Sequence, residues 1–419
     1  MIQKIINDTF VTAVIKLFSA FLKFLIILYI TNTFGAEEFG AYMFAMTVFL
    51  LVNLIFRFGF DLYVQREVSV FLEDNKQKEG VVLLLNTILV SVAFMFIATI
   101  VAEIFLYMAS SYIDSKKYSY MSLLLIFGVL HPIFWIISYY YRGVDRGKFS
   151  VINMEIIFPI IQIVLILIFY NFGYSAVYIL VYSFILSLIA CTAVYLYGIK
   201  DQLLNVYTES RFSKIDFSLN HVKKSHTFLM VSMTAIILSW SDILVISFFE
   251  TNQSIGIYSV ISKIGMVMMM PTSAVAIFFN NHVARCNARG DLEQIKKYAI
   301  VLTLLLFIVS LIGFSLINTF GIEILSFFGD EFRSAVIVLL IFTLAQLINA
   351  TAGVFESIFI MTNMRLLFLK INLFMIIINI ALNVPLVYMY GIDGAAIATL
   401  LSIVLARSVQ FYYVKRKLI

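Results

Sequence analysis

Long apolar runs separated by short polar stretches make up most of this chain. Each run extends over roughly 20 residues, the length at which an α-helix crosses the hydrocarbon core of a bilayer. The pattern therefore predicts an all-α membrane protein with about twelve transmembrane helices. These helices are expected at residues 10–33, 41–61, 81–109, 118–141, 151–171, 174–197, 227–249, 255–279, 298–320, 334–361, 366–390 and 393–414.

Composition supports a membrane protein and excludes a soluble globular one. Hydrophobic residues make up 62% of the chain and charged residues only 13%, with a mean hydropathy of +1.01. A soluble domain has roughly 25% charged residues. The first apolar segment contains Lys16 and Lys23 and lacks a small-residue cleavage site, so we expect it to stay in the mature protein rather than act as a signal peptide.

The placement of the basic residues predicts the orientation in the membrane. The chain has 29 Lys and Arg residues against 24 Asp and Glu residues. In the twelve-helix layout about 21 of the basic residues fall in loops on one side and about three on the other, which predicts that both termini are cytoplasmic. Because these residues occupy short loops between apolar helices, we do not expect the chain to bind nucleic acid.

The longest polar stretch divides the chain into two halves. Residues 198–226 are expected to form a cytoplasmic linker between an N-terminal lobe of six helices, residues 1–197, and a C-terminal lobe of six helices, residues 227–419. The pattern of an apolar residue, Gly, any residue and Tyr occurs at 39–42 and again at 255–258. Two such halves would have the same orientation and be related by an axis along the membrane normal, as in duplicated transporters.

Lys23 is a deeply placed charge in the first predicted helix. It lies about 20 Å from the start of that helix at the usual rise per residue. A Lys near the bilayer centre costs about 2.5–3.5 kcal/mol on insertion scales, so it requires a polar lumen or a partner. Thr12, Lys16, Ser19 and Lys23 follow at intervals of four, three and four, which places them on one helix face. The face is interpreted as the cationic lining of a cavity; the alternative is an ion pair with an acid of a neighbouring helix.

Asp242 is the corresponding acidic residue in the seventh predicted helix. Ser232, Ala235, Ser239 and Asp242 follow at helical spacing, and Lys263 lies in the next helix at a similar depth. The two charges would either form an ion pair or face the same cavity. The sequence leaves two roles open for Asp242, a structural ion pair and proton coupling.

Other polar residues in the helices have simpler explanations. Arg57 and Arg407 lie close enough to the cytoplasmic ends of their helices to extend to the interface, although Arg57 is also a candidate for the cytoplasmic mouth of a cavity. Glu155 and Glu356 are expected to be hydrated structural carboxylates near cytoplasmic helix ends. His131, which precedes a Pro in the middle of a helix, is either a core histidine or a proton relay.

The sequence contains no pattern that indicates catalysis. We find no Gly-rich loop that would hold a phosphate, no metal-ligand cluster and no nucleophile motif. Cys191 and Cys286 lie far apart and form neither a metal nor a redox spacing. We therefore expect no catalytic residue, no metal and no cofactor, and we do not expect an enzyme.

Three motif-like stretches point to a known family. They are Phe34-Gly35-Ala36-Glu37-Glu38-Phe39-Gly40-Ala41-Tyr42, then Phe58-Gly59-Phe60-Asp61 with Gln65-Arg66-Glu67, and finally Asn379-Ile380-Ala381-Leu382-Asn383 with Gly391-Ile392-Asp393-Gly394-Ala395-Ala396-Ile397-Ala398-Thr399. With these stretches the chain resembles the polysaccharide biosynthesis or O-antigen flippases, which translocate lipid-linked oligosaccharides and belong to the multidrug/oligosaccharidyl-lipid/polysaccharide exporter superfamily. The family often has an acidic residue two positions before the Gly of the second helix, where this chain has Arg57.

The resemblance implies a transporter fold and a function. It implies a V-shaped pair of six-helix lobes that open alternately to the two sides, with helices 1, 2, 7 and 8 lining the central cavity. The implied protein lies in the bacterial plasma (inner) membrane. It moves a polyprenyl-diphosphate-linked oligosaccharide, such as a repeat unit of lipopolysaccharide O-antigen or capsule, from the cytoplasmic to the outer leaflet. Its partners would be membrane lipid and, in the same synthesis, glycosyltransferases and a glycan polymerase.

The candidate site combines the resemblance with the charges found in the helices. We expect Lys16, Lys23 and Lys263, with Arg57 at the mouth, to bind the diphosphate, and Asp242 to take part in ion coupling. The first alternative is a multidrug extruder of the same superfamily. Peptidoglycan-precursor flippases usually have two more helices, and a membrane glycan polymerase would require a large external loop, whereas the external loops expected here are short.

Overall fold

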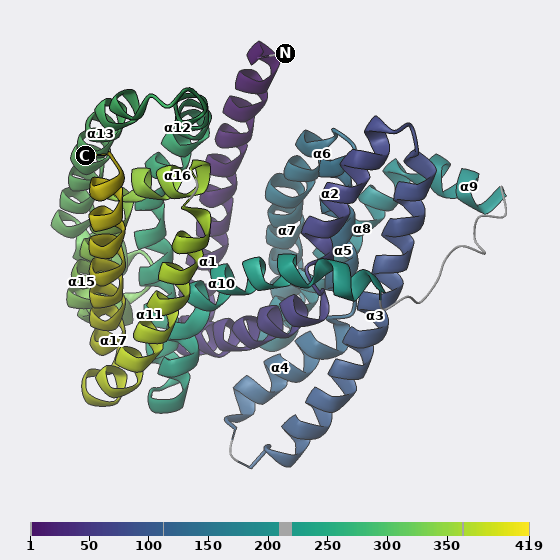
Figure 1. The fold of residues 1–419 in the computed structure, drawn as a ribbon. Coiled ribbons are helices and arrows are strands. Elements are labelled where there is room, and N and C mark those ends of the chain that lie inside the picture. Colours follow the sequence, from purple (N-terminus) through teal and green to yellow (C-terminus); the bar gives the residue numbers. More distant parts are fainter. Residues whose placement is uncertain (1, 112, 209–219, 363, 419) are drawn as a thin grey trace. The chain divides into compact units, whose positions relative to one another are not determined.

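The structure is a computed structural model that describes residues 2–111, 113–208, 220–362 and 364–418 (Figure 1). All secondary structure in these residues is helical. By length and apolar composition, eight helices of the described part are able to cross a membrane, or nine when the bent pair of α4 (Ser115–Phe127) and α5 (Leu130–Gly143) is one span. The membrane-spanning helical architecture expected from the hydropathy pattern is confirmed, whereas the number of twelve spans stays a prediction.

The chain forms two compact units, of which the first contains residues 1–26 and 44–236. Besides α4 and α5, its helices are most of α1 (Ile2–Phe56), α2 (Phe60–Glu73), α3 (Gln77–Met108), α6 (Gly147–Ile152), the π-helix η1 (Asn153–Ile157), α7 (Phe158–Asn171), α8 (Ala176–Gly198), α9 (Lys200–Thr208) and the first part of α10 (Asn220–Phe249). In its core, α5 packs against α2, α3 and α8. Tyr140, Tyr141 and Tyr195 are among the largest fully buried side chains of the first unit.

The second unit contains residues 27–43 and 237–419. Its helices are the remainder of α10, α11 (Asn252–Met266), the short 3-10 turn η3 (Val267–Met269), α12 (Met270–Arg289), α13 (Leu292–Thr319), α14 (Gly321–Ser326), η4 (Asp330–Ala335), α15 (Val336–Thr351), α16 (Gly353–Met361) and α17 (Arg365–Leu418). The lobe boundaries at 1–197 and 227–419 stay a prediction. The contacts assign residues 27–43 to the second unit and residues 227–236 to the first.

Two glycines explain why four expected spans lie within two long helices. Gly35 in α1 has φ 81° and separates the expected spans 10–33 and 41–61, and Gly391 in α17 has φ 57° and separates 366–390 from 393–414. Positive φ is strained for residues with a side chain, and glycine adopts it readily. Each glycine therefore marks a break in the helical backbone at the position where the hydropathy pattern expects one.

The two similar motifs at 39–42 and 255–258 contact each other within the second unit. A Cβ atom on Gly40 would lie 1.7 Å from the carbonyl oxygen of Asn252, and one on Gly256 would lie 2.1 Å from that of Ala36. Gly40 thus packs against Asn252, four residues before Gly256, and Gly256 packs against Ala36, four residues before Gly40. The missing side chains allow the two helix backbones to approach closely, as small residues do in membrane helix pairs.

Glu331 binds the backbone just before the motif at 39–42. Its carboxylate accepts hydrogen bonds from the backbone N–H of Ala36 and, at 3.1 Å, from Nε2 of Gln253. Nearby, Nδ2 of Asn32 donates to the carbonyl oxygen of Phe327 at 2.6 Å. Because Asn32 and Ala36 flank the break at Gly35, these contacts fix the backbone where α1 bends.

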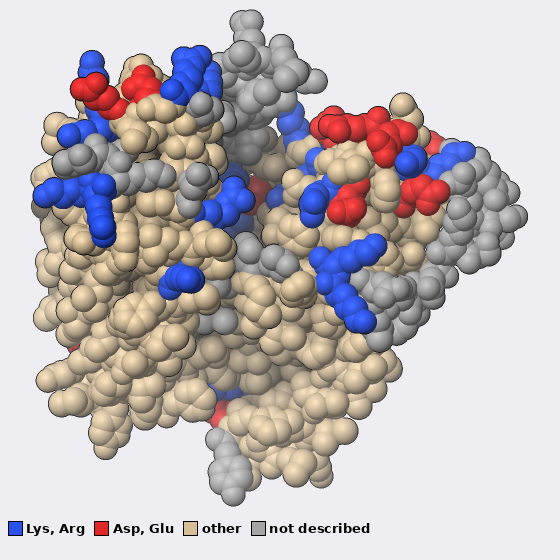
Figure 2. Space-filling model, in the orientation of Figure 1, with Lys and Arg blue, Asp and Glu red and all other residues tan. Residues whose placement is uncertain are grey.

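Charged side chains are unevenly spread over the surface. On the face drawn in Figure 2 the blue and red atoms gather in groups, and large continuous areas of the described surface are tan. Large apolar side chains are widely exposed on α13, where Ile300 and Leu304 are 61% and 58% exposed. A surface of this kind is expected where a protein contacts lipid rather than water.

Candidate functional site

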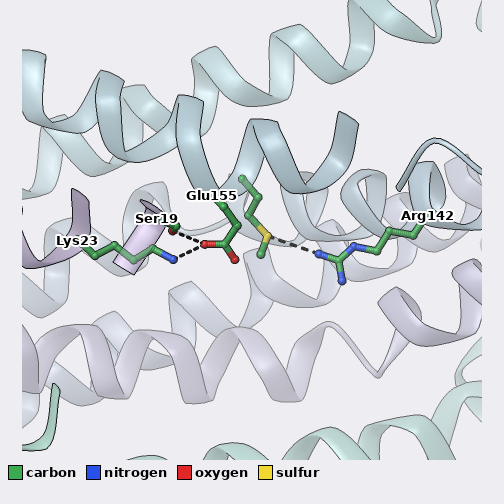
Figure 3. Close-up of polar contacts among 5 residues, drawn as sticks. Ser19, Lys23, Arg142 and Glu155 are labelled. Atoms are coloured by element: carbon green, nitrogen blue, oxygen red, sulfur yellow. Dashed lines mark hydrogen bonds and ion pairs between the residues drawn. The ribbon is translucent and has the colours of Figure 1, made fainter. Parts of the chain in front are cut away.

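Lys23 forms an ion pair with Glu155 in the first unit. Its Nζ lies 2.6 Å from Oε2 of Glu155, and the hydroxyl of Ser19 donates to the same oxygen at 2.5 Å (Figure 3). The Lys23 side chain is 53% exposed, and that of Glu155 is 13% exposed. The carboxylate is therefore held in the protein while the ammonium group keeps access to its surroundings.

Glu155 is a functional candidate that the sequence reasoning missed. We expected a hydrated structural carboxylate, whereas the structure places Glu155 in the π-helix η1 between α6 and α7. A π-helix is rare and frequently occurs at functional sites. Asn153 in the same turn donates its Nδ2 to the carbonyl oxygen of Cys191 at 2.9 Å, which anchors the irregular turn to α8. The signal in the sequence was an isolated acid in an otherwise apolar segment.

Lys16 adds a second positive charge to the same region. It is exposed, it precedes Lys23 by seven residues on the same face of α1, and its charge acts on the Glu155 carboxylate. The two lysines and Glu155 together have a net charge of about +1 when all are ionised. The side chain of Thr12, the first residue of the expected polar face, lies outside the described residues.

Arg57 occupies a different environment from the open mouth that the sequence suggested. Its Nη2 lies 3.2 Å from Oδ2 of Asp61, and the side chains are 7% and 4% exposed. The guanidinium carbon lies 4.9 Å from the centroid of a Trp135 ring, and the Trp135 indole N–H donates to Nε2 of His131 at 2.9 Å. Arg57 is thus buried in an ion pair, and His131 is a hydrogen-bonded core histidine, as the simpler interpretation expected.

The backbone explains why Arg57 turns inward. The helix ends at Phe56, and both Phe58 and Gly59 have positive φ, 54° and 70°. A Cβ atom on Gly59 would lie 2.4 Å from the backbone nitrogen of Leu229. The helix direction therefore changes directly after Arg57, and its side chain lies against α2 and α5 instead of extending to the interface.

Asp242 lies at the centre of a hydrogen-bond network in the second unit. It accepts hydrogen bonds from the hydroxyl of Tyr258 at 2.6 Å, from Nδ2 of Asn383 at 2.6 Å and from the hydroxyl of Thr399 at 2.8 Å. Oδ1 of Asn379 accepts from Asn383 at 3.3 Å and from Ser241 at 3.0 Å. Side chains from α10, α11 and α17 therefore converge on one carboxylate.

The hydrogen-bond network of Asp242 uses residues of the third motif-like stretch. Asn379, Asn383 and Thr399 all belong to the third stretch that carried the resemblance. They lie on both sides of the break at Gly391, which brings the two parts of α17 to the same carboxylate. The side chains of Ser232, Ala235 and Ser239, which the sequence placed on a face with Asp242, lie outside the described residues.

Lys263 lies against an aromatic ring in the same unit. Its Nζ is 4.7 Å from the centroid of a Trp240 ring, and the residue is half-buried. The hydrogen-bond donors described for Asp242 are the neutral groups of Tyr258, Asn383 and Thr399. A cation above an indole gains about 0.5–2 kcal/mol, so Trp240 stabilises the charge of Lys263.

Comparison with known proteins identifies the family. The sequence model described as polysaccharide biosynthesis protein matches residues 5–279. The chain belongs to this family. The resemblance inferred from the three motifs is thereby confirmed.

Within the described residues there is no group of three or more His, Cys, Asp or Glu that could hold a metal ion.

Two curated proteins of Haloferax volcanii are similar to parts of the chain. The probable low-salt glycan biosynthesis flippase Agl15 is 27% identical over 179 residues, which cover 42% of this chain and 37% of that protein. The probable flippase AglR is 30% identical over 181 residues, which cover 40% and 36%. The matched region thus spans little more than a third of the length of either relative.

Solved structures show the fold over nearly the whole chain. An inward-facing multidrug resistance MATE family transporter of the MOP superfamily matches with a TM-score of 0.74 at 14% identity, covering 97% of this chain and 98% of that one. The lipid II flippase MurJ in an inward closed conformation matches with the same TM-score of 0.74 at 14% identity, covering 97% and 87%. The chain therefore has the helical fold of this group of transporters.

Proposed function

We propose that this chain is a flippase that moves a polyprenyl-diphosphate-linked oligosaccharide from the cytoplasmic to the outer leaflet of the plasma membrane, with both termini in the cytoplasm. The family and the flippase names of the two relatives support this class of substrate. The observation that carries the proposal is the half-exposed side chain of Lys23, which lies on one helix face with Lys16 and far along the first membrane helix.

Such a substrate requires a cationic passage. Its diphosphate is anionic and its sugars are rich in hydroxyl groups, so passage through hydrocarbon without partners would cost several kcal/mol per polar group. Lys16 and Lys23 exceed the charge of Glu155 by about one unit, which leaves a positive region that attracts the diphosphate. Lys263 offers a further positive charge in the second unit, and Arg57 would contribute at the cytoplasmic mouth if its pair with Asp61 opened.

Glu155 gives this site a counter-ion that the substrate replaces. The carboxylate of Glu155 lies 2.6 Å from the ammonium group of Lys23 and balances its charge. An ion pair with such an exposed member contributes only about 0.2–1 kcal/mol, so a diphosphate, which has more charge and more acceptor oxygens, competes with it effectively. Binding of the diphosphate would release Glu155 from Lys23, and departure of the substrate would restore the pair.

Asp242 is the proposed site of ion coupling. Its carboxylate is held by two hydroxyl groups and one amide, which are neutral and leave its negative charge to be balanced by a proton or a small cation. Together with the Asp242 carboxylate, these groups provide oxygen atoms from three helices, α10, α11 and α17, the ligand type that hard cations require. Binding or release of the ion would therefore change the packing of α10 and α11 against the two parts of α17.

Cells that lack the gene provide a direct test. We expect the deletion strain to lose a surface glycan of the O-antigen or capsule type and to accumulate the lipid-linked intermediate. Wild-type protein should restore both levels, and Lys23→Gln should restore neither at equal protein abundance. If the deletion changed drug sensitivity and left glycan and intermediate unchanged, the multidrug extruder of the same fold would be the correct assignment.

A further inference from the structure

An apolar groove that the proposed transport function does not use lies in the second unit. This groove of about 500 Å³ separates α13 from the C-terminal part of α17, and α15 and α16 contribute Thr351 and Phe355 to its lining. These helices pack together in the unit (Figure 1). The buried residues Ala299 and Val414 form part of the lining and also belong to the core of this unit.

The groove is preformed rather than a gap between mobile side chains. The rings of Phe355 and Phe411 lie with their centroids 5.8 Å apart and together form one wall. Phe355 packs against the buried core cluster that contains Ala299 and Val414. Because packed core side chains keep their rotamers, the part of the groove formed by Ala299, Val414 and Phe355 is a fixed feature of the fold.

Two lysines give the otherwise apolar groove a charge preference. Lys296 in the second turn of α13 and Lys415 near the end of α17 both line it. Among the residues that the structure describes, neither lysine forms an ion pair with a carboxylate. Basic pockets between membrane helices at the ends of the spans bind anionic lipid head groups. The arrangement of an apolar groove with two cations matches the chemistry of an acyl chain joined to a phosphate.

We propose that this groove binds one anionic glycerophospholipid, with an acyl chain along the apolar lining and the phosphate between Lys296 and Lys415. The lipid would cover Ile300 and Leu304, which are otherwise largely exposed, and would link α13 to the end of α17. The site is separate from Lys23, Glu155 and Asp242, so it does not depend on the proposed transport function.

The chain contains a matched control for the charge. Lys297 and Arg416 directly follow Lys296 and Lys415, are exposed, and do not line the groove. The first double variant, Lys296→Gln with Lys415→Gln, therefore removes two positive charges from this surface. The second, Lys297→Gln with Arg416→Gln, removes the same net charge from the same surface. Only the first pair removes the charges that face the groove.

Native mass spectrometry of the purified chain with phosphatidylglycerol or phosphatidylcholine measures binding directly. We expect the wild type to retain phosphatidylglycerol in preference to phosphatidylcholine. Lys296→Gln with Lys415→Gln should weaken phosphatidylglycerol binding by about thirtyfold, which corresponds to about 2 kcal/mol. Lys297→Gln with Arg416→Gln should bind as the wild type does. Equal losses in the two double variants, or equal binding of the two lipids by the wild type, would overturn the proposal.

A steric variant tests the groove itself without changing charge. Leu304 lines the groove and is 58% exposed, whereas the adjacent Leu305 is 48% exposed and does not line it. Leu304→Trp should fill the groove and reduce bound phosphatidylglycerol at least tenfold, and Leu305→Trp should leave it unchanged. Undiminished binding by Leu304→Trp would show that the phospholipid lies elsewhere and would refute the site.

Discussion

The counter-ion role of Glu155 makes a prediction that separates it from a merely structural role. Replacement by Gln keeps the size of the side chain and an oxygen that accepts the Ser19 hydroxyl, and it removes the charge that neutralises Lys23. If the diphosphate must displace this carboxylate, Glu155→Gln should bind the diphosphate more tightly. A structural role predicts the opposite, since loss of the pair would loosen the site.

The expected size follows from the geometry of the pair. Lys23 is 53% exposed, so solvent screens the interaction and the pair contributes about 0.2–1 kcal/mol. Its removal should therefore strengthen diphosphate binding by up to about fivefold and change the free energy of unfolding by less than about 1 kcal/mol. Lys23→Gln should weaken binding by about tenfold or more, because it removes a hydrogen bond between charged groups.

The assay is equilibrium binding of a fluorescent short-chain polyprenyl diphosphate to the purified protein. The gain from Glu155→Gln should disappear when Lys23→Gln is also present, because the two residues act on the same anion. Asp74→Asn is the control, since it likewise removes the acid of a lysine ion pair, with Lys76 at 3.1 Å, outside the proposed site. Unchanged or weaker binding by folded Glu155→Gln protein would refute the counter-ion role.

Three further variants test the other parts of the molecule. Asp242→Asn should abolish the dependence of flipping in vesicles on an imposed proton or sodium gradient while diphosphate binding persists; flipping that responds to the gradient as in the wild type would exclude coupling at Asp242. Gly40→Ala should lower the free energy of unfolding in detergent by about 1–3 kcal/mol, because its methyl group meets the Asn252 carbonyl. A loss below this range would mean that the two helices separate easily at this position. Glu331→Gln should lower the free energy of unfolding by about 1–2 kcal/mol in the same measurement, since it weakens the hydrogen bonds to Ala36 and Gln253. An unchanged value would mean that these bonds do not stabilise the fold.

The sequence predicted the helical architecture well because hydropathy is a local property. Runs of apolar residues locate the spans, and the glycine breaks at 35 and 391 fall between expected helices. The Pro after His131 predicts a kink within the expected span 118–141, and α4 and α5 meet in that span at a bend of 54°. The sequence did not predict the π-helix at 153–157, which depends on how helices pack and on which backbone groups are satisfied elsewhere and is not encoded by hydropathy.

Candidate residues were easier to predict than their partners. The depth of Lys23 correctly implied a polar lumen or an acidic partner, but several acids of the chain could have supplied that partner, and the π-helix that presents Glu155 has no sequence signature. The helical spacing around Asp242 predicts one polar face and stays a prediction, whereas the partners Tyr258 and Thr399 come from other helices. The ion pair of Arg57 with Asp61 follows a backbone turn at Phe58, whose positive φ the sequence does not indicate.

The most direct test of the central claim is flipping of a fluorescent polyprenyl-diphosphate oligosaccharide in vesicles that contain the purified protein. Lys23→Gln and Lys76→Gln each remove one lysine of an ion pair, and only Lys23 belongs to the proposed passage. The account predicts that the wild type and Lys76→Gln flip the lipid at equal rates and that Lys23→Gln is at least about tenfold slower at limiting substrate. Wild-type flipping by Lys23→Gln would contradict the cationic passage.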